Sequence, residues 1–114
     1  RAGAADLFSI YVGKAGGIGP ARRIAAVAEA AGLGCTVGSN LELGVGSAAM
    51  IHLAMSAPAI RPEQIACDIT GPLFYEEDIL VEPLPITGGR AAPHDRPGLG
   101  VELDQDKIRR YRVA

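Results

Sequence analysis

The sequence is poor in the residues that often dominate a protein core or a disulfide framework. It contains no Trp, 4% aromatic residues and two cysteines among 114 residues. Its 11 basic and 13 acidic residues leave a net charge of -2, so we expect no binding to nucleic acid or to an anionic membrane. No run of about 18 apolar residues occurs, so we expect no membrane-spanning helix.

The beginning of the chain and its cysteines bear on where the protein works. Residues 1–6 hold neither an initiator Met nor the apolar stretch of a signal peptide, so we expect that something upstream has been removed. Cys35 and Cys67 lie far apart in apolar surroundings, which favours two reduced core residues in a cytoplasmic protein. With 48% hydrophobic residues and few aromatics, the core must be aliphatic and rich in Ala.

Short apolar runs alternate with stretches of helical periodicity. Residues 7–12 predict a strand covered on both faces, and 13–17 predict a turn. A helix follows, with Pro20 near its first turn and Gly32 at its end. Its apolar positions recur at helical spacing: Ile24, Val27, Ala28 and Ala31.

The alternation continues for two more strands and then stops. Residues 35–37 and 65–69 predict short buried strands, and 45–57 predict a helix that is apolar on nearly every side. Irregular or hairpin structure is expected over 80–90, and a short helix over 103–111. Strands that alternate with helices predict an α/β fold with parallel pairing. Three such strands leave open edges, so the closing part of an eight-stranded barrel fits better than a complete small doubly wound domain.

In a parallel barrel the chemistry gathers at the carboxyl ends of the strands. The first such end holds Tyr11 and Lys14. Tyr11 is either an aromatic core residue or an acid–base group, and Lys14 points either into solvent or into the cavity. The glycines at 13–17 form either a tight turn or a cradle for a phosphate.

The next two strand ends carry carboxylates. Glu42 and Asp68 each follow a predicted strand, where a carboxylate binds substrate, orients a neighbour or caps the next helix. Asn40 has the same capping alternative. His52 and His94 have no potential ligand at metal-binding spacing, so we expect no metal site in this chain.

Four segments, taken together and in order, resemble the muconate-lactonizing branch of the mandelate racemase/muconate lactonizing enzyme family, within the enolase superfamily. Residues 10–18, Ile-Tyr-Val-Gly-Lys-Ala-Gly-Gly-Ile, are similar to the family's sixth barrel strand and the turn after it. Residues 37–42, Val-Gly-Ser-Asn-Leu-Glu, resemble its strand seven, and 67–74, Cys-Asp-Ile-Thr-Gly-Pro-Leu-Phe, its strand eight. Residues 97–101, Pro-Gly-Leu-Gly-Val, are similar to the tail that returns toward the family's N-terminal capping domain.

The resemblance implies the C-terminal part of a (β/α)₈-type barrel, strands six to eight in residues 1–79, with a tail in 80–114 that packs toward the capping domain. It implies a Mg²⁺-dependent cycloisomerase, epimerase or dehydratase that removes a proton next to a carboxylate. The metal ligands and one catalytic Lys would lie upstream, so this segment alone would be inactive. The implied partners are a small carboxylate substrate, the N-terminal remainder and further copies in a homo-oligomer.

Two positions depart from the family pattern. Tyr11 stands at the position of the family's strand-six catalytic Lys, which weakens a two-base racemase and favours a one-base reaction. Thr70 replaces the second acidic residue of strand eight, which weakens binding of a dipeptide amine. The resemblance implies that the substrate is bound by six residues: Lys14, Ser39, Asn40, Glu42, Asp68 and Thr70.

Two readings compete with an enzyme. A catalytically silent binding module on a degenerate barrel would explain Tyr11 as a mark of lost activity. A free-standing small α/β ligand-binding domain would require that the 114 residues fold cooperatively and alone.

Overall fold

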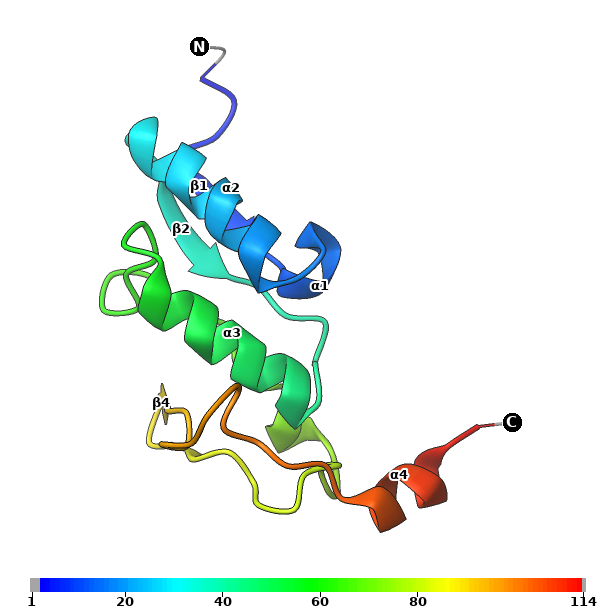
Figure 1. The fold of residues 1–114 in the computed structure, drawn as a ribbon. Coiled ribbons are helices and arrows are strands. Elements are labelled where there is room, and N and C mark those ends of the chain that lie inside the picture. The colour runs from blue at the N-terminus through cyan, green and yellow to red at the C-terminus, as the bar shows by residue number, and fades with distance from the viewer. Residues whose placement is uncertain (1–2, 114) are drawn as a thin grey trace.

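A computed structural model describes residues 3–113 of the chain (Figure 1). Two short parallel strands and two long helices form its main body, and a largely irregular tail follows. The elements in chain order are β1 (Leu7–Ile10), α1 (Val12–Ala15), α2 (Ile18–Ala30), β2 (Gly34–Val37), α3 (Gly44–Ser56), the 3₁₀ helix η1 (Gly71–Phe74), β3 (Ile86–Thr87), β4 (Arg90–Ala91) and α4 (Gln105–Tyr111).

The expected parallel pairing is confirmed for the first two strands. β1 pairs with β2 in parallel, with Leu7 opposite Gly34 and Ile10 opposite Val37. The expectation that both faces of the first strand are covered is wrong, because Leu7 and Phe8 are 38% and 41% exposed. Among the described residues β1 is an edge strand, and α2 and β2 are the elements that contact it.

The first predicted helix is confirmed, but of its predicted apolar positions Ala28 is buried whereas Ile24 and Val27 are exposed. Ala21, Ala25 and Ala28 are buried at the spacing of successive helical turns, and their small side chains let α2 lie close to the strands. Ile24 and Val27 are 42% and 71% exposed instead. α2 therefore has two apolar faces, and periodicity alone did not distinguish them.

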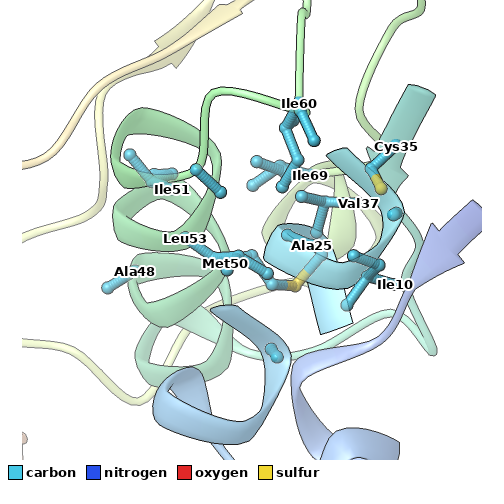
Figure 2. Close-up of a cluster of buried hydrophobic side chains, with 14 of the residues drawn as sticks. Ile10, Ala25, Cys35, Val37, Ala48, Met50, Ile51, Leu53, Ile60 and Ile69 are labelled. Carbon is cyan, nitrogen blue, oxygen red and sulfur yellow. The ribbon is translucent and has the colours of Figure 1, made fainter. Parts of the chain in front are cut away.

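Helix α3 packs against α2 and β2. Met50, Ile51 and Leu53 are almost completely buried, and Figure 2 shows them in a cluster with Val37 and Ile10. Cys35 belongs to the same cluster, and burial raises the pKa of its thiol. Both cysteines are free, as expected.

The third predicted strand, 65–69, is wrong as a strand. This segment lies beside β2, because the Asp68 amide donates to the Val37 carbonyl at 2.8 Å. The Ala66 carbonyl, however, accepts from the Thr36 side-chain hydroxyl at 2.8 Å. A side chain thus takes the place of a backbone partner, and no ladder forms.

The predicted turn at 13–17 is also wrong in part. Residues 12–15 form the four-residue helix α1, which ends at Gly16 and Gly17, with φ of 88° and 109°. These left-handed conformations favour glycine and reverse the chain into α2.

The tail packs on the body through a few apolar side chains. Leu80 and Leu84 are buried, and Leu99 and Val101 pack against the same core. β3 and β4 form the expected hairpin around two glycines of positive φ, whereas α4 buries no residue and projects from the body (Figure 1). Among the described residues, no helix is long and apolar enough to cross a membrane.

Candidate active site

The loops that follow β1 and β2 leave the sheet at the same end (Figure 1). Tyr11 follows β1 directly and occupies the N-cap position of α1 in an extended backbone conformation. Lys14 follows one helical turn later and places its ammonium nitrogen 3.6 Å from the centre of the Tyr11 ring. This cation–π contact fixes a positive charge beside the phenol.

Gly38 brings the end of β2 against Tyr11. A Cβ atom at Gly38 would stand 2.5 Å from Cε2 of the Tyr11 ring and would also overlap the hydroxyl of Ser9. Only glycine fits at this position, because any side chain would displace the ring. The Tyr11 ring therefore lies directly on the backbone that leads to Ser39, Asn40 and Glu42.

Ser39, Asn40 and Glu42 form one hydrogen-bonded group. The Ser39 hydroxyl donates to Glu42 Oε2 at 2.6 Å, and the Asn40 amide N–H donates to the same oxygen at 2.9 Å. The Asn40 side-chain amide donates to Glu42 Oε1 at 3.3 Å. Burial alone would raise the pKa of Glu42, but these hydrogen bonds outweigh it and hold that pKa below its usual value.

Asp68 and Thr70 form a smaller pair. The Thr70 hydroxyl donates to Asp68 Oδ1 at 2.8 Å, so it orients that carboxylate. Gly71 then places the chain against Glu42: a Cβ atom there would lie 2.8 Å from the Glu42 amide nitrogen and would overlap its carbonyl oxygen. The backbone after the Asp68 pair thus touches the backbone that carries Glu42.

The structure therefore groups all seven predicted site residues into three clusters on adjoining backbone segments. Within residues 3–113 no side-chain hydrogen bond joins one cluster to another, so the clusters meet through backbone contacts. Sequence reasoning missed Leu41, which has a φ of 61°, and Tyr75, whose hydroxyl donates to the Leu41 carbonyl at 2.8 Å. A leucine carries no sequence signal for a left-handed conformation.

The chemistry of these groups suits a small polar ligand. Lys14 supplies a cation, Tyr11 a hydroxyl, and Glu42 and Asp68 supply carboxylates with preset orientations. The described residues contain no group of three or more His, Cys, Asp or Glu side chains that could hold a metal ion. These residues alone do not fit a metal centre, and we derive no step through one.

Comparison with known protein families identifies the fold. The model of the family described as enolase C-terminal domain-like matches residues 1–107. The chain belongs to that family. The predicted resemblance to the muconate-lactonizing enzymes is confirmed as well, because relatives and solved structures with that name are similar to the chain.

Three of these similar proteins illustrate how closely the chain matches them and what their names say. Muconate cycloisomerase 1 of Rhodococcus opacus is 36% identical over 111 residues, which cover 97% of this chain and 29% of that protein. N-succinyl-L-Arg/Lys racemase of Bacillus cereus is 38% identical over 112 residues, 96% of this chain and 28% of the racemase. The crystal structure of a Pseudomonas fluorescens muconate lactonizing enzyme complexed with muconolactone superposes with a TM-score of 0.89 at 35% identity, over 97% of this chain and 29% of that one.

The chain thus spans less than a third of the length of the relatives it matches. The coarser fold prediction is confirmed, since the chain is a mixed α/β region shared with these enzymes. The names of the relatives include a cycloisomerase, a dehydratase and a racemase, so membership in the family leaves the reaction open.

Proposed function

We propose that this chain supplies the region of strands six to eight and the C-terminal tail of an enzyme that removes a proton from the carbon next to a carboxylate. Residues 65–69 then lie at the place of strand eight, although they form no strand within residues 3–113. In this proposal residues 1–79 belong to the barrel and 80–114 to the tail. The family match over residues 1–107 and the order of the three clusters support it. The Mg²⁺ that enzymes of this superfamily use would be held by residues outside this chain.

Tyr11 carries the finer proposal about the reaction. It stands beside the cation of Lys14 at the end of β1, and in this proposal its hydroxyl donates a hydrogen bond or a proton to bound substrate. A phenol supplies no cation where the family has its strand-six lysine, so a reaction that uses a lysine on each face of the substrate is incomplete here. We therefore favour a one-base reaction, cycloisomerisation or dehydration, over racemisation with a base on each face.

The other six predicted residues receive roles that follow from their contacts. Lys14 attracts the substrate carboxylate, and Glu42 and Asp68 bind its polar groups. Ser39 and Asn40 act through Glu42, to which both donate hydrogen bonds, and Thr70 acts through Asp68. The complete protein is then a cytoplasmic homo-oligomer acting on a small carboxylate, with no nucleic acid or membrane partner.

A catalytically silent binding module is the second candidate. One observation favours it: Tyr11 occupies the position where the family has a catalytic lysine. It predicts that the complete protein binds small carboxylates with Lys14, Glu42 and Asp68 and does not change them.

The test uses the full-length protein with Mg²⁺ and small carboxylates, among them muconate and N-succinyl amino acids. Reactions run in D₂O and followed by NMR report both product formation and exchange of the proton next to the carboxylate. Lactone formation or elimination supports the proposal, and racemisation with deuterium exchange contradicts the one-base reaction. Binding of these carboxylates without turnover or exchange supports the silent module.

A further inference from the structure

The loop over residues 38–43, here called the Glu42 loop, is held in a conformation that it does not favour on its own. Leu41 has a φ of 61°, a left-handed conformation that costs a residue with a Cβ atom about 1–2 kcal/mol. Leu41 itself makes one hydrogen bond within the loop that offsets part of this cost: its amide donates to the Ser39 hydroxyl at 2.7 Å. That same hydroxyl also orients Glu42, so relaxation of Leu41 would disturb the carboxylate.

A residue from outside the loop supports this conformation. Tyr75 follows η1, and its hydroxyl donates to the Leu41 carbonyl at 2.8 Å across 34 positions of sequence. Gly71, at the start of η1, leaves room for the Glu42 backbone to approach. The segment after the Asp68 pair thus holds the Glu42 loop from its outer side.

Tyr75 contributes little else to the packing. The residue is 45% exposed and does not belong to the buried core. Its hydroxyl, by contrast, has a partner at the one residue of positive φ in the loop. A purely structural role for an exposed ring would not require this hydrogen bond.

We propose that Tyr75 is a positioning residue: by bonding the Leu41 carbonyl, it keeps the Glu42 carboxylate fixed for substrate. The inference rests on the proposed function, because it assumes that Glu42 binds substrate. The geometry it concerns, however, can be measured without any turnover. The lowered pKa of Glu42 reports the hydrogen bonds from Ser39 and Asn40, so it reports the state of the loop.

The test compares Tyr75→Phe with Tyr111→Phe in the full-length protein. Both changes remove one phenol hydroxyl from a half-exposed ring, but the Tyr111 hydroxyl donates to Glu77, which lies outside the Glu42 loop. Glutamate labelled with ¹³C at the side-chain carboxyl is titrated by NMR, and Glu42→Gln identifies the signal. We expect Tyr75→Phe to raise the pKa of Glu42 toward that of an ordinary glutamate, and Tyr111→Phe to leave it unchanged.

Two further readouts complete the design. Melting temperatures establish that both variants are folded, and Tyr75→Phe should raise KM or the Kd for muconolactone about two- to tenfold, the effect of one lost hydrogen bond. An unchanged Glu42 pKa in a folded Tyr75→Phe variant overturns the inference. If no carboxylate is turned over but the pKa rises as expected, the proposed function fails and the positioning of Glu42 by Tyr75 stands.

Discussion

Hydrogen bonds within its own loop hold the pKa of Glu42 below its usual value. Removing the Ser39 hydroxyl in Ser39→Ala deletes the 2.6 Å bond to Oε2, and we expect the pKa of Glu42 to rise. Because the folded pKa is lowered, ionised Glu42 stabilises the native state above about pH 4.3, the ordinary glutamate value, and this contribution is lost as the pH falls through the folded pKa. In Ser39→Ala the folded pKa of Glu42 is closer to the ordinary value, so less stability is lost when the pH falls. Glu42 is then protonated at a higher pH, and substrate binding is lost at that higher pH.

The measurement is the acid limb of ligand binding between pH 3 and 6 in the full-length protein, beside the NMR titration of Glu42. Ser56→Ala is the matched control, since its hydroxyl donates to the Leu53 carbonyl within α3. Identical acid limbs for Ser39→Ala and the wild type would show that Ser39 does not set the charge of Glu42.

Gly38 tests whether the placement of Tyr11 matters for turnover. In Gly38→Ala the new methyl group would stand 2.5 Å from the Tyr11 ring, so we expect the ring to move and turnover to fall at least tenfold. Gly13→Ala is the control, because a Cβ atom there meets no other atom within 4 Å. Steady-state kinetics of both full-length variants measure this effect. Equal turnover rates for Gly38→Ala and Gly13→Ala would contradict a catalytic role for Tyr11.

Residue types and their place near the ends of predicted strands were enough to choose candidate side chains, but not to show how they are held. Tyr11 and Asp68 lie near the ends of predicted strands, and Glu42 comes after one. The contact of Gly71 with Glu42 and the bond from Tyr75 to Leu41 join residues about 30 positions apart. Such contacts depend on the path of the intervening chain, which no local pattern encodes.

Helix α3 obtains its N-terminal cap from a distant part of the chain. Its N-cap residue is Leu43, which has no side-chain acceptor, and its first turn holds no acidic residue. Asp78 supplies the acceptor, since its Oδ1 receives the Gly44 amide at 3.0 Å. The carboxylate also lies at the positive end of the helix dipole and ties the segment just before the tail to α3.

We therefore expect Asp78→Ala to destabilise the full-length protein by about 1 kcal/mol, whereas Asp78→Asn retains an acceptor and most of the stability. Asp104→Ala is the comparison, because Asp104 caps α4 locally by accepting from Asp106 and Lys107 amides. Loss of that cap should fray only α4, which buries no residue. Thermal melts of the three variants test this, and an equal effect of Asp78→Ala and Asp104→Ala would contradict it.

At the level of elements, the sequence predicted the long helices well and the short strands unevenly. Of the two 13-residue helices, α2 has periodic apolar residues and α3 is apolar on nearly every side; both have clear ends, so their existence was predictable. Segment 65–69 has strand composition, yet Thr36 bonds the Ala66 carbonyl and no ladder forms. That outcome depends on one side chain in the neighbouring strand, and composition could not predict it.

The whole chain is less compact than a complete domain of its length. Its radius of gyration is 15.0 Å, whereas a compact domain of this size has about 13 Å. Two apolar grooves remain open among the described residues. One, of about 580 Å³, is lined by Phe8, Ile24 and Val27, and the other, of about 720 Å³, by Met55, Ile69 and Leu73.

Grooves of this kind usually contact another part of a protein. We expect the isolated 114-residue chain to self-associate, and the full-length protein to cover the groove at Val27, which is 71% exposed here. Val27→Lys should then have opposite effects in the two settings. It should reduce association of the isolated chain, and it should lower the melting temperature of the full-length protein by burying a charge.

Val113→Lys is the matched control, because Val113 is 89% exposed and outside both grooves. It should change neither property. Native mass spectrometry measures the association of the isolated chain, and thermal melts measure the stability of the full-length protein. A monodisperse 11.8 kDa monomer that melts cooperatively, with no effect of Val27→Lys on the full-length protein, would instead support a free-standing ligand-binding domain. In that case the groove at Val27 is a surface of the finished fold, and the search for function moves from turnover to ligands.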